Sequence, residues 1–235
     1  TGKTEAFFIP ILEHCLQTDE PGLKSIIVYP MKTLGVDQLN RFITYLDQIN
    51  RSRQPEDRIT VGVWDSDTPT RVGTRSYEIE KGSYVRGLEC PRADNEKLKI
   101  LDDMTIGTDD HQYSWIRVTR DAIRSGVDIL LTNPEALDHM FVSDSDETRE
   151  ILGAAPGEHP VEHIVYDEAH VWSGISGAGI SLLTERLKHF YADRKPQVTM
   201  VSATVDNPTE LASALTGSSE NAINAIDFTG RSLPH

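Results

Sequence analysis

Two short polar strings in this chain contain residue types that can do chemistry. The first, Gly2-Lys3-Thr4, combines a flexible residue, a cation and a hydroxyl in consecutive positions. Lys3 is placed to reach the β- and γ-phosphates of a nucleoside triphosphate, and the Thr4 hydroxyl can bind Mg²⁺. Alone, the string is also typical of a turn before a helix, with Thr4 as the cap.

The second string lies far downstream, where the apolar run Ile164–Tyr166 leads into Asp167 and Glu168. Such a run indicates a buried strand, which would deliver both carboxylates to the edge of a sheet. Asp167 can hold Mg²⁺, directly or through water, and Glu168 can orient and deprotonate an attacking water. A solvated acidic turn fits less well, because apolar and aromatic residues run directly into the acids. Together, the strings predict a site for a nucleoside triphosphate and Mg²⁺.

The first string is only the second half of a phosphate-binding loop. The complete pattern, G-x-x-x-x-G-K-[ST], has an earlier glycine that would precede residue 1. We therefore expect residues 1–235 to form one ATP-binding domain that is cut within its phosphate loop.

The composition limits the possible partners and the compartment. The net charge of −14 argues against nucleic acid, because phosphate contacts come from Lys and Arg. A binding surface can nevertheless be locally basic on an acidic body. The two cysteines, Cys15 and Cys90, lie far apart, which fits a reducing cytoplasm. We expect a cytoplasmic protein with no membrane partner, because no apolar run is long enough to span a bilayer.

Apolar segments alternate with segments of helical periodicity along the chain. The expected strands are 25–30, 60–64, 128–133, 163–167 and 197–201, with a last candidate at 223–228. The expected helices are 5–16, 34–49, 135–141, 179–191 and 208–215. This alternation predicts an α/β fold in which helices flank a parallel sheet. Ligands of such a sheet gather at the carboxyl ends of its strands.

The stretch 69–126 is too long for an ordinary connection and is expected to be an inserted subdomain or long loop. It contains a charged, weakly periodic part at 77–103 and a predicted helix around 115–123. Cys90 has no second cysteine nearby. Four ligands cannot be assembled from it and scattered histidines such as His111, so no zinc site is predicted.

The order of the polar strings resembles the first RecA-like motor domain of superfamily-2 DEAD/DEAH-box helicases, a P-loop NTPase fold. The strings that carry this resemblance are Gly2-Lys3-Thr4, Asp167-Glu168-Ala169-His170, Ser202-Ala203-Thr204, Tyr29–Leu34 with Gln38, Asp67-Thr68 and Thr132–Glu135. They cover nearly the whole chain, and all but the first lie at the end of an expected strand. The stretch 167–177 resembles the YprA-like helicases of DNA repair and phage defence.

The resemblance implies a role for each matching residue. Gly2, Lys3 and Thr4 would bind ATP, and Thr4 and Asp167 would hold Mg²⁺. The catalytic residues would be Glu168 as the base, Asp167 and His170, and the hydroxyls coupling the nucleotide to the nucleic acid would be those of Ser202 and Thr204. The DNA or RNA strand would lie along Pro30, Met31, Lys32, Gln38, Thr132, Pro134 and Glu135.

We therefore expect the ATP-binding lobe of a nucleic-acid helicase or translocase. A second RecA-like domain, absent from this chain, would supply an arginine finger, so the isolated lobe should have little ATPase activity. Two other interpretations stay open. One is a catalytically idle nucleic-acid-binding module, against which the intact Asp167–Glu168 pair argues. The other is an ATPase with a different substrate, against which the Pro30 and Thr132 segments argue.

Overall fold

The computed structural model describes residues 2–18, 20–143, 149, 151–152, 161–191, 195–203 and 205–226. Its α-helices are α1 (Lys3–Gln17), α2 (Lys32–Asn50), α3 (Arg120–Arg124), α4 (Pro134–Ser143), α6 (Gly174–Phe190) and α7 (Pro208–Thr216). Its strands are β1 (Ser25–Val28), β2 (Val61–Trp64), β3 (Tyr84–Glu89), β4 (Lys97–Ile100), β5 (Ile106–Gly107), β6 (Gln112–Tyr113), β7 (Ile116–Arg117), β8 (Ile129–Thr132), β9 (His163–Tyr166) and β10 (Gln197–Met200).

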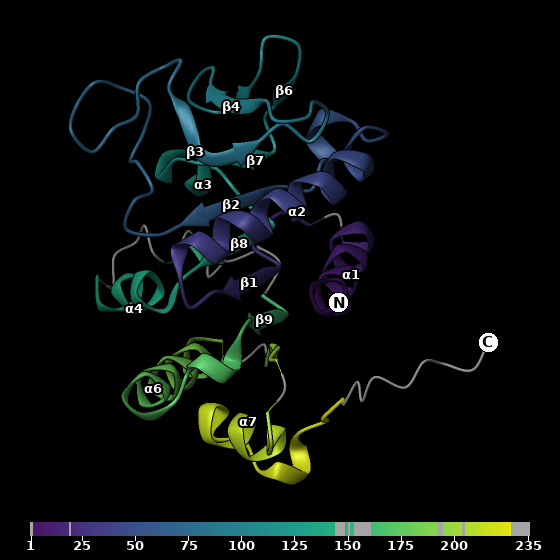
Figure 1. Cartoon of the computed structure of the whole chain (residues 1–235), viewed down its shortest axis with the longest axis vertical. Coiled ribbons are helices and arrows are strands. Elements are labelled where there is room, and N and C mark those ends of the chain that lie inside the picture. Colours follow the sequence, from purple (N-terminus) through teal and green to yellow (C-terminus); the bar gives the residue numbers. More distant parts are fainter. Residues whose placement is uncertain are drawn as a thin grey trace.

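Six parallel strands form the central sheet, in the order β10-β9-β1-β8-β2-β7 (Figure 1). The last residues of four strands are in register. Val28 pairs with Tyr166 on one side and Thr132 on the other, and Thr132 pairs with Trp64. The segments that follow β1, β2, β8 and β9 therefore leave the sheet at one edge, where ligands of parallel sheets bind.

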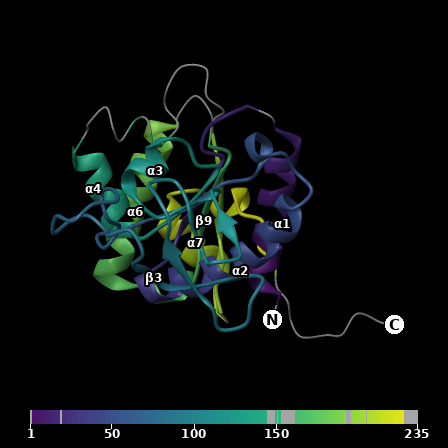
Figure 2. The same cartoon turned by 90° about the horizontal axis from the view of Figure 1, so that it is seen from above.

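Helices cover both faces of this sheet, which explains why its strands are continuously apolar. Side chains alternate between the faces along a strand. Ile27 and Val165 pack with α1 and α2, whereas Ile26 and Ile164 pack with α4, α6 and α7. In Figure 2, α1 lies on the right and α4 and α6 lie on the left, with the strands between them. The expected α/β fold with a helix-flanked parallel sheet is confirmed.

A second sheet of four antiparallel strands, β3-β4-β5-β6, lies within residues 69–126. It occupies the upper end of the molecule in Figure 1, beyond α2. The Asn40 side chain on α2 donates to the carbonyl of Gly87 at 2.7 Å and accepts from the amide of Glu89 at 3.1 Å. The second sheet is thus fastened to α2 by its edge strand.

Asp47 on α2 makes a further link to this region. Its side chain is 1% exposed and accepts hydrogen bonds from Arg92 at 2.6 Å and Arg51 at 2.5 Å. Burial alone would raise the pKa of this carboxyl, but the two arginines lower it overall. A carboxyl with a lowered pKa stabilises the fold above its unfolded pKa, and this contribution is lost as the pH falls through its folded pKa.

We expect Asp47→Ala to lower the free energy of unfolding by about 2 kcal/mol, because two arginines lose a shared buried partner. Urea unfolding at neutral and acidic pH measures this effect, and the difference between variant and parent should shrink as the pH falls. Asp37→Ala, at an exposed position of the same helix, is the control. Equal losses in both variants would contradict the assignment.

Most of the predicted elements are confirmed within one to five residues of their ends, but two predictions are wrong. The helix predicted at 115–123 is instead the strand β7 followed by the short α3, which begins where the Thr119 hydroxyl accepts from the amide of Ala122. The strand predicted at 223–228 is absent from Ile223–Ile226, the part of it that the structure describes. None of the helices among the described residues combines the length and apolar character needed to cross a bilayer.

Candidate functional site

The two polar strings meet at the carboxyl edge of the central sheet. Nζ of Lys3 lies 4.0 Å from Oε1 of Glu168. Gly2, just before α1, has a left-handed φ of 72°. Apart from its chain neighbours, none of the described residues has an atom within 4 Å of the place where its Cβ would be. The first amides of α1 have no partner within the helix and carry its positive dipole end. A cation, free amides and open space thus occur together, as a phosphate group requires.

Thr4 is buried and joined to α2 by two hydrogen bonds. Its hydroxyl donates to Oε1 of Gln38 at 3.2 Å and accepts from Nη1 of Arg41 at 3.0 Å. Gln38, predicted among the nucleic-acid-binding residues, therefore lies against the nucleotide string. The sequence analysis missed Arg41, although it follows Gln38 by three positions and so shares its helix face.

Asp167 and Glu168 are held by strand pairing and by a strained turn. The amide of Asp167 donates to the carbonyl of Val28 at 3.0 Å, which extends the β9–β1 pairing. Glu168 has a left-handed φ of 52°, and its amide donates to Oδ1 of Asp167 at 2.9 Å. A left-handed backbone is unfavourable for a residue other than glycine and is often kept where it aims a functional group.

The environment of Asp167 suits a cation. Its side chain is buried, and this burial raises the pKa of the carboxyl, as does the nearby charge of Glu168. Lys3 and Arg41 act in the opposite direction but do not cancel the effect. Carboxylate and hydroxyl oxygens are ligands that Mg²⁺ prefers. The donor set of Asp167 and Thr4, with a carboxylate removed from water, therefore fits Mg²⁺.

His170 connects this edge to the segment after β10. Its Nδ1 lies 3.3 Å from Oε2 of Glu168 and accepts from the amide of Ala203 at 3.4 Å. One imidazole nitrogen cannot donate to the Glu168 carboxylate and accept from the Ala203 amide at the same time. His170 can therefore make only one of these two hydrogen bonds at a time. The Ser202 hydroxyl is buried without a hydrogen bond among the described residues. Thr204, predicted to act with Ser202, lies outside them.

A shallow groove, with a cavity of only about 10 Å³, lies at the ends of β1, β2 and β8. It is lined by Tyr29, Met31, Lys32, Gly35, Val63, Asp65, Leu131, Thr132 and Asn133. Met31 is 58% exposed at the start of α2. Nζ of Lys32 lies 2.9 Å from a carboxylate oxygen of Asp67 and donates to the Ser66 hydroxyl at 2.5 Å. The groove therefore places a cation beside the uncapped end of a long helix.

The remaining residues predicted to bind nucleic acid lie near the ends of β1 and β8 or at the start of α4. The Thr132 side chain is buried, and its hydroxyl donates to the carbonyl of Trp64 at 2.8 Å. The Asn133 side chain accepts from the amide of Ala136 at 2.8 Å and so caps α4. Pro134 and Glu135 form the first turn of α4, and Pro30 lies between β1 and Met31. Thr132 thus stabilises the wall of the groove by joining the ends of β8 and β2.

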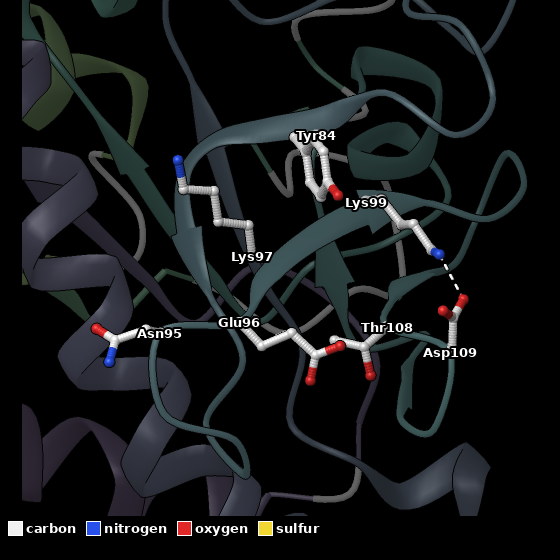
Figure 3. Close-up of a pocket in the computed structure, with 7 residues that line it drawn as sticks. All are labelled: Tyr84, Asn95, Glu96, Lys97, Lys99, Thr108 and Asp109. Atoms are coloured by element: carbon white, nitrogen blue, oxygen red, sulfur yellow. Dashed lines mark hydrogen bonds and ion pairs between the residues drawn. The ribbon is translucent and has the colours of Figure 1, made fainter.

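A hollow of about 310 Å³ lies elsewhere, on the second sheet (Figure 3). It is lined by Tyr84, Asn95, Glu96, Lys97, Lys99, Thr108 and Asp109. Nζ of Lys99 lies 2.5 Å from Oδ1 of Asp109, so opposite charges neutralise each other there. Because none of these residues belongs to the polar strings, we place the functional site at the edge of the central sheet despite this hollow's size.

The chain is similar to several known proteins. The sequence pattern of the family described as "DEAD/DEAH box helicase" matches residues 1–65 and 94–211. "Uncharacterized ATP-dependent helicase YprA" of Bacillus subtilis (strain 168) is 30% identical over 130 residues, which are 52% of this chain and 16% of YprA.

Solved structures of the DUF1998 helicase MrfA share the fold. One superposes with a TM-score of 0.57 at 20% identity, over 92% of this chain and 25% of MrfA. A second, of MrfA bound to DNA and AMPPNP, gives the same TM-score and identity over 92% of this chain and 22% of that chain. The chain therefore spans a quarter or less of these relatives.

Proposed function

The chain belongs to the DEAD/DEAH box helicase family, and on that premise we propose that it is the ATP-binding lobe of a nucleic-acid-dependent helicase or translocase. The observation that carries the proposal is the meeting of Lys3 and Glu168 beside the buried Asp167 and Thr4. This set combines a cation for phosphates, oxygen ligands for Mg²⁺ and a carboxylate that can act as a base.

The residues divide the work of ATP hydrolysis among them. Lys3 and the first amides of α1 hold the β- and γ-phosphates, and Thr4 and Asp167 hold Mg²⁺. When bound, Mg²⁺ neutralises charge that develops on the phosphate oxygens. Glu168 orients the attacking water and accepts its proton. Lys3, which lies beside Glu168, shifts toward the phosphates and leaves that carboxylate free to act.

Helix α2 offers a direct connection between the nucleotide site and the groove. Its first residues, Met31 and Lys32, line the groove, and Gln38 and Arg41 of the same helix contact Thr4. A helix is a stiff element, so a small shift at one end is transmitted to the other. We propose that binding of a DNA or RNA strand at the groove is transmitted to Thr4 through this helix. His170 makes a second connection, to the Ser202–Thr204 segment.

We also propose a domain organisation, a nucleic-acid partner and a location for the protein. Residues 1–235 act as one motor domain, with 69–126 as an insertion that α2 supports. A second RecA-like domain completes the ATP site and supplies the arginine finger. The nucleic-acid partner is DNA or RNA. The structure of MrfA bound to DNA and AMPPNP supports such a partner for this fold. The free cysteines Cys15 and Cys90 fit a cytoplasmic location.

Lys32→Ala tests the groove as the strand-binding surface. We expect the variant to bind single-stranded DNA and RNA about 5- to 10-fold more weakly at low salt, because one phosphate contact is lost. The slope of log affinity against log salt should fall by about 1. Fluorescence anisotropy of labelled oligonucleotides over a range of salt concentrations measures both quantities.

A substitution of Asp67, the ion-pair partner of Lys32, should have the opposite effect on nucleic-acid affinity. Asp67→Asn removes the carboxylate that competes with phosphate for Lys32, so it should raise the strand affinity. Lys81→Ala, at an exposed turn of the insertion, controls for a general loss of positive charge. Equal weakening by Lys32→Ala and Lys81→Ala would remove the groove from the proposal.

A further inference from the structure

Two histidines and a glutamate come together at the edge of the sheet opposite the nucleotide site. His14 lies in the last turn of α1, whereas Glu162 and His163 stand at the start of β9. One potential metal-binding atom from each side chain lies within 4.8 Å of the other two. The His14 and His163 rings meet edge to face, with centroids 5.5 Å apart. These residues belong to none of the helicase strings.

One pair of these potential ligand atoms has a separation that suits a bound ion. Nδ1 of His14 lies 3.5 Å from Oε2 of Glu162, which is longer than an ordinary N–H···O hydrogen bond. Two ligands of a tetrahedral metal, with bonds of about 2.0–2.1 Å, are separated by roughly 3.3–3.4 Å. The pair therefore has nearly the separation that a shared ion would give it.

The backbone around the cluster is already fixed. The amide of Glu162 donates to the carbonyl of Lys24 at 3.0 Å, and the carbonyl of Glu162 accepts from Gln197 at 2.8 Å. His163 is in register with Ser25 and Gln197 on the neighbouring strands. His14 is held by a helix whose inner face is buried in the core. Little ordering remains to be done when an ion binds, which favours affinity.

We propose that His14, Glu162 and His163 bind a divalent transition-metal ion, Zn²⁺ above all. Two imidazoles and one carboxylate are the ligand set of zinc sites that keep one coordination position for water, and imidazole ligands disfavour Mg²⁺. His14 lies about 16 Å from Lys3 along α1, at a rise of about 1.5 Å per residue. The ion would thus join α1 to β9 at their far ends, away from the Mg²⁺ position.

The consequence would be mechanical. α1 carries Lys3 and Thr4 at one end and His14 at the other, and β9 carries His163 at its start and leads into Asp167. A metal ion that joins the far ends would restrain the two elements whose near ends form the ATP site. This inference does not depend on the proposed function, since zinc binding can be measured without nucleotide or nucleic acid.

The test is a calorimetric titration of the chelator-treated, 235-residue chain with Zn²⁺ in the presence of excess Mg²⁺, which occupies the carboxylate site near Asp167. We expect one Zn²⁺ per chain and a higher midpoint of thermal unfolding with zinc. Co²⁺ in place of Zn²⁺ should give the visible absorption of a four-coordinate site. A parent chain that takes up no stoichiometric zinc would overturn the proposal.

Variants separate this site from non-specific zinc binding. His14→Gln and His163→Gln should each weaken zinc binding by at least about 10-fold, because loss of a direct ligand costs at least as much as loss of a supporting contact. Glu162→Gln, at a half-exposed position, should do so without affecting folding, which circular dichroism checks. His189→Gln, at an exposed position of α6, should bind zinc like the parent. Unchanged binding in Glu162→Gln and the two histidine variants would refute the site.

Discussion

Glu168→Gln should lower the rate of nucleic-acid-stimulated ATP hydrolysis by about 10²–10⁴-fold, the usual contribution of a general base. The glutamine keeps the size of the side chain and its ability to accept a hydrogen bond, but it cannot take the proton of the attacking water. ATP binding should be retained or tightened, because Lys3 loses a competing carboxylate 4.0 Å away. Steady-state phosphate release and the affinity for a fluorescent ATP analogue, measured in the full-length protein, test the two halves of this prediction.

An exposed acid on α1 supplies the control for this experiment. Glu13→Gln removes the same charge at the end of the helix remote from Lys3 and should leave both the rate and the ATP affinity unchanged. The full-length protein is needed for the rate measurement, because the arginine finger of the proposed second RecA-like domain would be worth about 10³-fold or more. Hydrolysis that survives Glu168→Gln at the parental rate would remove Glu168 from the role of general base.

The central sheet could be predicted because its strands are buried on both faces. Ser25–Val28, Ile129–Thr132 and His163–Tyr166 read as short apolar runs between polar turns, and such runs carry a strong local signal. The second sheet could not be predicted. β5 and β6 are two residues long, too short for any periodicity. β3 is fixed to α2 by contacts with Asn40 that no local pattern encodes.

The placement of the two polar strings was more predictable than their contacts with α2. Lys3 lies beside Glu168, as expected from a sheet whose ligands gather at the carboxyl ends of its strands. The contact between Arg41 and Thr4 was missed, because periodicity shows that a helix has a buried face but not which element covers it. The same limit applies to His14 and His163, whose side chains only the fold brings together. His14 and His163 lie far apart along the chain and have no metal-binding spacing.

Gln38 shows how the position of a residue in a motif can differ from the position of its side chain. It follows the groove residues Met31 and Lys32 on α2, yet its amide oxygen accepts from Thr4. A helix rises by about 1.5 Å per residue, so Gln38 lies about 9 Å beyond Lys32 along α2. The two ends of this helical segment thus lie at the two proposed binding sites, and this arrangement makes α2 suited to couple them.

Asp167→Asn should have opposite effects on stability and on nucleotide binding. Burial raises the pKa of this carboxyl, so the folded state holds the proton more readily than the unfolded state. Folding stability then falls as the pH rises from the unfolded pKa through the folded pKa, and the ionised carboxylate destabilises the fold at neutral pH. Asparagine carries no charge and can still accept from the amide of Glu168, so the ligand-free variant should be more stable by about 1 kcal/mol.

With Mg²⁺ and ATP bound, the parent should be more stable than the Asp167→Asn variant. Asparagine is a poor ligand for Mg²⁺, so Mg²⁺-dependent ATP binding should weaken by at least about 10-fold. The parent should gain stability from bound nucleotide and the variant should gain little. Thermal unfolding of both chains with and without Mg²⁺-ATP, at neutral and acidic pH, measures all of these effects. A variant that is less stable than the parent without ligand, yet equally stabilised by Mg²⁺-ATP, would mean that Asp167 is a structural carboxylate and that the metal lies elsewhere.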